Sequence, residues 1–397
     1  RLCGKTLCER KHCASSMRLS PGTVTSSLNP LRILHTEASP GWGGQEIRIM
    51  EEMRWFRGRG HEMALVAPLH SQLFHKATAE GFETFHLTFT KNKLASETFR
   101  MGSLIGSFKP DVIATHSSVD SWAGLIAGTV RRVRCRIRYR HVSTPVRGHF
   151  LNRWQYRSLC HLVFTTGECI RQPLLETFSL APEKVITAPT AIRAPDALLP
   201  KSQAKRQLQE ELGLGSDTFF IGQVSVLRSW KGHLVLKEAF ALIADAFPNL
   251  HLVFVGGGPQ EPMLTELLSA DPLRDRIHLV GHKSDPWPYF RSLDLAVLAS
   301  VSNEGIPQSL LQAMYAEVPV VGSKVGCMPE IVSDGKTGLL VEPADASSLA
   351  GALQRLLEDA SLQDSFVMAA KEKVLRDFQW DALGGRLEAA FHGILSV

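Results

Sequence analysis

The amino-acid sequence predicts an α/β protein made of two doubly wound domains that face a central cleft. Three observations lead to this prediction. Short apolar runs alternate with segments of helical periodicity from residue 31 onward, a polar stretch with three prolines at 194–217 interrupts the alternation, and the alternation then starts again. The length of 397 residues is also more than one hydrophobic core usually organises.

The first half contains five apolar runs that we expect to be strands. They cover residues 31–36, 61–68, 111–116, 161–168 and 184–189. A glycine turn, GWGG at 41–44, and an amphipathic stretch at 47–60 follow the first run, as in a strand–turn–helix unit. Strands separated by helices of this length join into a parallel sheet through right-handed crossovers.

The second half repeats this architecture without repeating the sequence. Its expected strands cover residues 219–226, 250–258, 276–281, 293–300, 318–323 and 337–343. We therefore predict a first domain at 31–200, a second domain at 201–377, and a C-terminal helix at 378–397 that crosses back to the first domain. The carboxyl ends of both sheets would face the cleft, where ligands of parallel sheets bind.

Composition and charge narrow the class of protein. A hydrophobic content of 44% with 21% charged residues is ordinary for a globular protein, and no apolar run is long enough to span a membrane. The charge is uneven: residues 1–200 carry +12 of a total that is only +5. We expect a cytoplasmic protein, either free or attached peripherally to the inner face of the membrane.

The basic excess peaks at residues 131–157, which hold nine arginines and no acid. Arg136, Arg138 and Arg140 alternate along a strand-like segment and would line one face with guanidinium groups. One interpretation is a solvated edge strand that its charge keeps from pairing. The other is a surface for an anionic lipid or a phosphorylated glycan, whereas nucleic acid is disfavoured because no nucleic-acid-binding module accompanies the patch.

The seven cysteines indicate no disulfide framework. Four are scattered through strand-like or loop segments and are expected to be small buried side chains in a reducing compartment, namely Cys135, Cys160, Cys169 and Cys327. The other three, Cys3, Cys8 and Cys13, lie near His12 in a polar segment. A zinc site is one interpretation of that segment, but CxxC pairs are absent, so a flexible leader at residues 1–30 outside the fold is favoured.

Two loops carry candidate phosphate-binding groups. Gly43 and Gly44 would let a backbone approach a ligand closely at the start of a helix, although a tight turn without a ligand explains them equally well. The turn does not match GxGxxG, which counts against a nicotinamide-dependent oxidoreductase. Arg228 and Lys231 stand on a strand-to-helix turn in the second half, where cations suit a diphosphate; two solvated surface cations are the alternative.

A third loop combines an acid with a helix start. Glu304 follows the strand-like run 293–300, and Pro307 is suited to the first turn of a helix. The amides of Gln308 and its two successors would then be free donors at a positive helix end, with Gln312 about two turns into the helix. An acid, a row of amides and a hydrogen-bonding side chain fit a nucleotide-sugar. The alternative is that Glu304 only caps the helix.

The segment NEGIPQSLLQAMYAEVPVVGSKVGCMPEIVSDGKTGLLVEPAD, beginning at residue 303, resembles the donor-site signature of the retaining glycosyltransferases of family 4, which have the GT-B fold of two Rossmann-like domains. SVLRSWKGH at 225–233, LHLVFVGGGPQ at 250–260 and VFTTGECIRQPLLETFSL at 163–180 support the resemblance. It runs from about residue 31 to the C-terminus and is looser in the first half.

The resemblance implies roles for single residues. Glu304 would be the first acid of the family's E-x7-E motif beside the donor sugar. His116 would lie close to the transferred sugar as a positioning or polarising residue, and a strand-end histidine with satisfied hydrogen bonds is the alternative. The loop Gly305, Ile306, Pro307 and Gln308 would reach sugar hydroxyls and phosphate, Arg228 and Lys231 would hold the diphosphate, Gly281 and His282 would lie near the base, and Gly43 and Gly44 would lie near the phosphates.

Two positions depart from the family pattern. Gln312 stands in place of the second acid, which binds ribose hydroxyls, and its amide oxygen can accept from a hydroxyl as well. Arg193 stands where the family often has an aspartate. No Asp-x-Asp occurs in the chain, so cations and helix amides rather than a metal would stabilise the leaving nucleoside diphosphate.

The sequence therefore predicts a retaining, metal-independent hexosyltransferase without a cofactor. Its donor would be a nucleoside-diphosphate sugar, and its acceptor a lipid-linked or cell-surface glycan such as lipopolysaccharide core, O-antigen or exopolysaccharide. The front-face mechanism of the family would assign Glu304 to orienting the donor or stabilising charge. Two alternatives stay open: a non-catalytic nucleotide-sugar sensor, suggested by Gln312 and Arg193, and a GT-B epimerase or phosphorylase.

Overall fold

The computed structural model describes residues 29–396. The first half comprises β1 (Arg32–Thr36), α1 (Gly44–Gly58), β2 (Glu62–Ala67), α2 (Gln72–Ala79), β3 (Glu83–His86), α3 (Leu94–Phe108), β4 (Val112–Thr115), α4 (Ser118–Val130), β5 (Cys135–Arg140), α5 (Phe150–Trp154), β6 (Leu162–Thr165), α6 (Glu168–Phe178) and β7 (Val185–Thr187). The hypotheses about a leader and a zinc site concern residues that lie almost entirely outside the described part.

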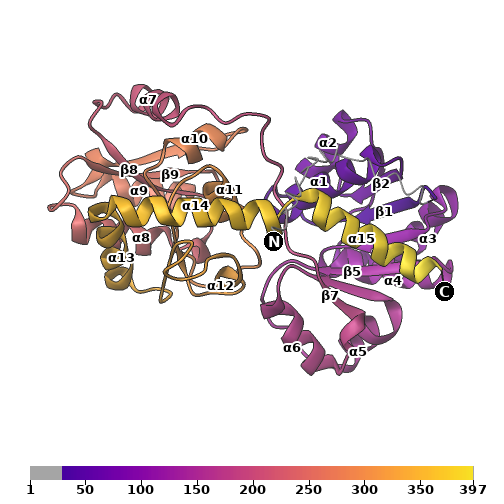
Figure 1. Ribbon diagram of the computed structural model, residues 1–397. Helices are drawn as coiled ribbons and strands as arrows, with labels where there is room; N and C mark the ends of the chain where they lie inside the picture. Colours follow the sequence, from indigo (N-terminus) through magenta and orange to yellow (C-terminus); the bar gives the residue numbers. More distant parts are fainter. Residues whose placement is uncertain (1–28, 397) are drawn as a thin grey trace, which may run out of the picture. The chain divides into compact units, whose positions relative to one another are not determined.

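The second half begins with α7 (Figure 1). It comprises α7 (Lys201–Leu212), β8 (Phe219–Val224), α8 (His233–Ile243), β9 (Leu250–Val255), α9 (Glu261–Ser269), β10 (Ile277–Gly281), α10 (Trp287–Ser292), β11 (Leu295–Leu298), α11 (Gln308–Tyr315), β12 (Val320–Ser323), α12 (Met328–Ile331), β13 (Leu339–Val341), α13 (Ala346–Glu358), α14 (Ala360–Asp377) and α15 (Trp380–Leu395).

Both sheets are parallel and doubly wound, as predicted. The first has seven strands in the order β3-β2-β1-β4-β5-β6-β7, and the second has six in the order β10-β9-β8-β11-β12-β13. The strand order reverses between β1 and β4 and again between β8 and β11. Loops at such switch points diverge to opposite faces of the sheet and leave a crevice for a ligand. The candidate site loops follow these four strands.

Continuous apolar runs form the central strands because parallel sheets are covered on both faces. Ile33, Leu65 and Ile137 are fully buried in the first sheet, and Ile221 and Leu252 are fully buried in the second. The strand β3 was not expected from the sequence, since ETFH is short and only half-buried at the edge of the sheet. Its polar composition hid it from a search for apolar runs.

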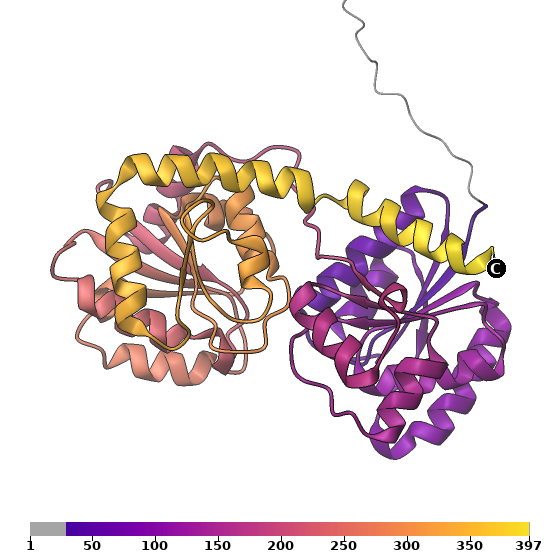
Figure 2. The ribbon, with the colours of Figure 1, turned by 60° about the horizontal axis from the view of Figure 1, so that its bottom comes forward.

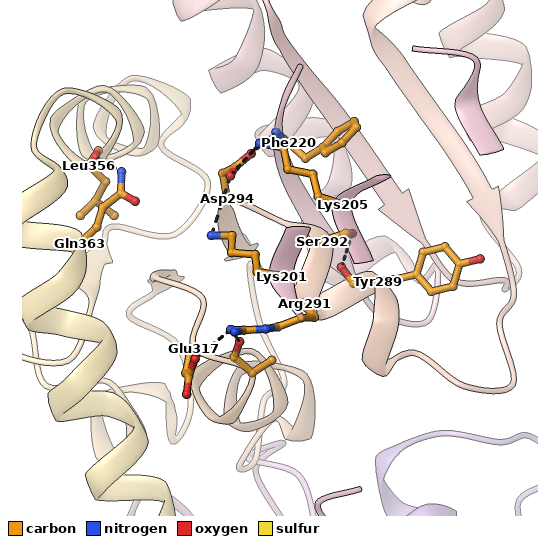
Figure 3. Close-up of polar contacts among 11 residues, drawn as sticks. Lys201, Lys205, Phe220, Tyr289, Arg291, Ser292, Asp294, Glu317, Leu356 and Gln363 are labelled. Atoms are coloured by element: carbon orange, nitrogen blue, oxygen red, sulfur yellow. Dashed lines mark hydrogen bonds and ion pairs between the residues drawn. The ribbon is translucent and has the colours of Figure 1, made fainter. Parts of the chain in front are cut away.

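The helix α7 belongs to the second half through ion pairs at the amino end of β11 (Figure 3). The Asp294 carboxylate lies 2.8 Å from Lys205 Nζ and 3.8 Å from Lys201 Nζ, and it also accepts from the Phe220 backbone N–H at 2.8 Å. One acid therefore ties two turns of α7 to the first residues of β8. The polar stretch 194–217 is an extended connection followed by this docked helix.

The chain ends with α15, drawn in yellow in Figure 2, which packs against the first sheet. Trp380, Leu383, Leu387 and Phe391 are buried in one cluster with residues of β1, α1 and β5. Apolar residues three and four apart on a helix share one face, so this spacing produces a continuous stripe toward that core. In residues 29–396, no helix combines the length and the apolar character that crossing a bilayer requires.

Candidate active site

Glu304 is buried at the switch point of the second sheet and forms an ion pair. Lys231 Nζ donates to Glu304 Oε1 at 2.6 Å, and Ser300 Oγ donates to the same oxygen at 2.6 Å. The helix α11 begins with Pro307 at its N-cap and has no side-chain cap, so the interpretation of Glu304 as a helix cap is wrong. Among the described residues, no hydrogen bond is made by Glu304 Oε2, which leaves this atom for a ligand.

The turn that carries Lys231 is held against the end of β11. Gly232 has φ of 70°, and a Cβ at this position would overlap the carbonyl group of Ala299, so only glycine fits. Gln223 of β8 donates to the Lys231 carbonyl at 2.9 Å and accepts from the Ala299 N–H at 3.1 Å. The buried Gln223 amide therefore links the Lys231 turn to the end of β11 and fixes the position of Lys231 relative to Glu304.

The Glu304–Gly305 peptide is confined between two backbones. A Cβ on Gly305 would lie 2.7 Å from Thr166 Oγ1 and closer still to the carbonyl oxygen of His141, which follows β5 of the first sheet. A Cβ on Gly326 would overlap the carbonyl group of Glu304 from the other side. The loop is thus seated on the first sheet without room for a side chain.

The start of α11 lies beside the glycine turn of the first half. Gln308 Nε2 lies 3.4 Å from the Gly44 carbonyl oxygen, and Ile306 and Pro307 are buried beneath it. The first N–H groups of α11 have no partner within the helix. Gln312 is half-buried one turn further along the helix.

Arg228 faces the same turn. Its guanidinium lies over the Trp230 ring at 5.0 Å, and its Nη2 lies 3.8 Å from the position that a Cβ of Gly41 would occupy. The Gly43 N–H is held by Glu46 Oε2 at 2.9 Å, which fixes the turn before α1. The structure therefore places Arg228 at the glycine turn, whereas Lys231 is engaged by Glu304.

A second glycine turn, which was not among the predicted site residues, supports the loop of Arg228. Cβ atoms on Gly256 and Gly258 would clash with the backbones of Ser225 and Leu227. The Gly256 N–H donates to the Gly281 carbonyl at 2.9 Å, and a Cβ on Gly257 would contact His282 Cβ at 3.3 Å. The predicted pair of Gly281 and His282 is thereby placed next to this turn. Three consecutive glycines after a strand were the available signal.

His116 lies between two other histidines. Its Nε2 is 2.9 Å from His35 Nδ1 and its Nδ1 is 2.9 Å from His141 Nε2. The three rings are stacked with centroids 5.2 Å apart, and His116 is almost fully buried. Because both ring nitrogens are engaged, we interpret His116 as a positioning residue rather than a group that touches the sugar.

Two buried acids flank this chain at the switch point of the first sheet. Asp120 Oδ2 accepts from Thr36 Oγ1 at 2.6 Å and from the His116 N–H at 3.0 Å. Glu37 accepts from the side chains of Gln45 and Ser117. Burial raises the pKa of Glu37, and burial together with the neighbouring Glu37 charge raises the pKa of Asp120 to about 7.

The structure contradicts the prediction that β5 presents a face of guanidinium groups. The strand pairs with β4 and β6 on its two sides, so it is not an edge strand, and Arg138 is buried. Arg138 donates to the His116 carbonyl at 2.8 Å, Arg136 to the Leu159 carbonyl at 2.7 Å and Arg140 to the Thr144 carbonyl at 2.7 Å. The three guanidinium groups tie loops to the sheet instead of forming a charged face.

The prediction that all four cysteines of the strand-like and loop segments are free is wrong for two of them. Cys169 at the start of α6 and Cys327 before α12 form a disulfide between positions 158 residues apart, while Cys135 and Cys160 are free and buried as expected. Beside the disulfide, Glu330 accepts from the Cys169 N–H at 2.8 Å and from the preceding N–H at 2.9 Å, which places a carboxylate at the start of α6. Within residues 29–396, Cys169, Cys327 and Glu330 form the one group of side chains spaced closely enough to hold a metal ion. The two sulfur atoms are already bonded to each other.

Arg193, which stands where the family often has an aspartate, forms an ion pair with α1. Its guanidinium lies 3.4 Å from Glu51 Oε2 on α1 and is mostly exposed. The neighbouring Ile192 N–H donates to the Phe378 carbonyl at 3.1 Å, which links this segment to the chain before α15. Arg193 therefore pairs with an acid of α1 on the surface.

Two family models match the chain. The model described as "Glycosyl transferases group 1" matches residues 204–373, and the model described as "Glycosyltransferase Family 4" matches residues 42–194. The chain is 28% identical over 189 residues to an N-acetyl-alpha-D-glucosaminyl L-malate synthase of Bacillus anthracis, covering 48% of this chain and 49% of that protein. It is 28% identical over 183 residues to a phosphatidyl-myo-inositol mannosyltransferase of Mycobacterium leprae, covering 46% and 47%. The match spans about half the length of these curated relatives.

The fold is similar to that of solved structures over most of the chain. The crystal structure of Anabaena HepE in complex with UDP aligns with a TM-score of 0.77 at 18% identity, covering 91% of this chain and 100% of that chain. This likeness confirms the architecture that the resemblance implied.

Proposed function

Because the chain belongs to the family 4 glycosyltransferases, we propose that it moves a sugar from a nucleoside-diphosphate donor to a bacterial lipid-linked or cell-surface glycan, such as lipopolysaccharide core, O-antigen or exopolysaccharide. The anomeric configuration is retained and no metal takes part. The observation that carries this proposal is the buried pair of Glu304 and Lys231 at the switch point, beside the start of α11 and the glycine turn of the first half.

The donor site follows from the free groups of this arrangement. Glu304 Oε1 is occupied by Lys231 and Ser300, so Oε2 is available to a sugar hydroxyl. Arg228 and the first N–H groups of α11 supply positive potential for a diphosphate, with the glycine turn close enough for backbone contact. Such preorganised donors stabilise a leaving diphosphate without a metal ion.

The reaction is a substitution at the anomeric carbon. The bond between that carbon and the diphosphate oxygen breaks while the acceptor oxygen attacks from the same face. The acceptor proton passes to the departing phosphate oxygen, so that charge and atoms balance. The Glu304 carboxylate stabilises the positive charge that develops on the sugar and orients its hydroxyls.

The acceptor approaches along the segment that follows β5. Phe150 and Trp154 on α5 are exposed by 76% and 46%, and Arg147 and Arg153 are exposed beside them. This combination of aromatic and basic side chains suits the surface of an anionic membrane. Within the same segment, Thr144 Oγ1 lies 3.1 Å from Asn303 Oδ1, next to Glu304, so a lipid-linked acceptor held here reaches the donor loop.

Donor class and turnover are tested together. UDP-, GDP- and ADP-sugars are incubated with the wild type and with Glu304→Gln, with membrane extract as the acceptor, and nucleoside diphosphate release and thermal shift are recorded. Release from one donor that is lost in the variant while the thermal shift persists supports the transferase. A thermal shift without release in either protein would indicate the nucleotide-sugar sensor instead.

The acceptor surface has its own test. Phe150→Ser and Trp154→Ser should each weaken co-sedimentation with vesicles of anionic phospholipid and lower turnover of a lipid-linked acceptor. Phe99→Ser is the matched control, since Phe99 is 79% exposed on α3 outside the basic segment. Vesicle binding that is equally affected by all three substitutions, or by none, would contradict this surface.

A further inference from the structure

A chain of buried imidazoles runs through the first sheet from a buried carboxylate to the donor loop. His35, His116 and His141 stand at or just after the ends of β1, β4 and β5, which are neighbours in the sheet. The chain ends near Gly305, because the His141 carbonyl is in the path of a Cβ at that position. At its inner end, His35 Nε2 lies 4.0 Å from Glu52 Oε1 on α1.

All three imidazoles are neutral, which constrains their protons. Burial lowers the pKa of His35 to about 3, and burial with nearby positive groups lowers the pKa values of His116 and His141 well below their usual range. A neutral imidazole has one N–H and one lone pair. In a chain of two hydrogen bonds every N–H must therefore point the same way, either all toward Glu52 or all toward His141.

The buried carboxylate decides between these two arrangements. When Glu52 is ionised, it attracts the Nε2–H of His35, so His35 Nδ1 accepts from His116 and His116 Nδ1 accepts from His141. The remaining nitrogen, His141 Nδ1, then carries a lone pair. When Glu52 is protonated, its O–H faces the lone pair of His35 and the whole chain reverses, so that His141 Nδ1 carries the hydrogen.

We propose that Glu52 and His35 are positioning residues, through which the buried carboxylate selects the tautomers of the histidine chain so that His141 offers its Nδ1 lone pair to a hydroxyl group of the substrate. Of the three histidines His141 is the most exposed, at 9% against 3% for His116 and 0% for His35. The link to substrate rests on the proposed transferase function, whereas the order of the tautomers does not.

The surroundings of Glu52 are consistent with a carboxyl group that changes charge near neutral pH. Burial raises its pKa to about 7, against the opposing effects of Arg48 and the hydrogen bond from the Tyr139 hydroxyl. Arg48 Nε lies 3.9 Å from Glu52 Oε2, and Arg386 on α15 is the further charged group that acts on Arg48. His35 Nε2 and Glu52 Oε2 have no hydrogen-bond partner in the described part of the chain, so both are free to respond.

The tautomers can be measured directly by nitrogen-15 spectra of the full chain with labelled histidine, assigned with single His→Gln variants. In the wild type at pH 8 we expect the Nε2–H tautomer at all three positions, and a change toward Nδ1–H at pH 6. Glu52→Gln should abolish this pH dependence. Tautomers that are the same at pH 6 and pH 8 in the wild type would overturn the proposal, and that comparison does not depend on whether a variant folds.

The kinetic consequence is measured separately. At pH 8, Glu52→Gln should lower kcat at least tenfold with donor KM changed less than twofold, and the rise of kcat with pH near 7 should disappear. Glu238→Gln, which alters an exposed acid on α8, is the matched control and should behave as the wild type. An unchanged pH profile in Glu52→Gln would overturn the proposal. If no donor is turned over by the wild type, the transferase function fails while the spectra still test the tautomers.

Discussion

Gly305→Ala tests whether the donor loop depends on its seat against the first sheet. The added methyl group would lie 2.7 Å from Thr166 Oγ1, where ordinary contact begins at 3.4 Å, and it would lie closer still to the His141 carbonyl. The loop cannot retreat, because the Glu304 carbonyl is already in contact with the backbone at Gly326. Overpacking of this kind costs about 1–3 kcal/mol of unfolding free energy.

The effect on catalysis should exceed the effect on stability. The overlap forces Glu304 and the start of α11 to move by roughly 1 Å, and a misplacement of about 1 Å can lower the rate about 100-fold. We expect kcat/KM for the donor to fall by about that factor, with a modestly lower melting temperature. The assay is steady-state nucleoside diphosphate release together with thermal denaturation.

A second glycine provides the control. Gly351 lies in α13, and a Cβ there meets nothing within 4 Å, so Gly351→Ala should leave kcat/KM unchanged and stabilise the helix by up to about 1 kcal/mol. The reasoning is refuted if Gly305→Ala retains kcat/KM within twofold of the wild type and melts at the same temperature. That result would mean that the loop has another position of equal energy.

Three further outcomes follow from buried or cross-linked groups. Lys231→Met leaves the Glu304 carboxylate without its cation and should cost about 3–5 kcal/mol in denaturant unfolding at pH 7, most of it regained when Glu304→Gln is added; an equally unstable double variant would contradict this. Reduction of the disulfide should lower the unfolding free energy by about 2–4 kcal/mol, and Cys169→Ser should make stability insensitive to reductant; a wild type whose stability does not change with reductant would contradict this. Because folding raises the pKa of Glu52 from its ordinary value of 4.5 to about 7, ionisation opposes the folded state, so the stability of the wild type relative to Glu52→Gln should fall as pH rises from 4.5 to 7; parallel stability curves would refute it.

The sheets were predictable because their central strands are covered on both faces and so are written as apolar runs. Such runs, separated by helices, identified the two halves of the fold and every strand except β3 and β5. The strand β5 was predicted from its alternating arginines instead. The sequence did not reveal which strands lie inside the sheet and which lie at its edge. The alternating arginines of β5 were therefore interpreted as a solvent-exposed surface. Arg138 is buried and Arg136 and Arg140 are half-buried, because β5 is an inner strand against which α4 and α15 pack. This packing is a property of the tertiary structure and not of the segment.

The site divides in the same way. Glu304, Arg228 and Lys231 lie in local patterns, a strand end followed by a turn and a helix, and the sequence pointed to each of them. What no local pattern revealed is which side chains meet: Lys231 is 73 residues from Glu304, and His35 is 81 residues from His116. The buried Glu52 is one of several acids on an amphipathic helix, and nothing in its neighbours along the chain distinguishes it.

The sequence by itself determined the two parallel sheets, the loops that end their switch-point strands, and the family to which those loops belong. These properties depend on the order of residues over short spans, where periodicity and turn chemistry act. The tertiary structure alone decided the pairing of Glu304 with Lys231, the seating of Gly305 on the first sheet, the disulfide between positions 158 residues apart and the order of the histidine chain. Each of these depends on the distance between segments remote in sequence, which only the packing of the sheets sets.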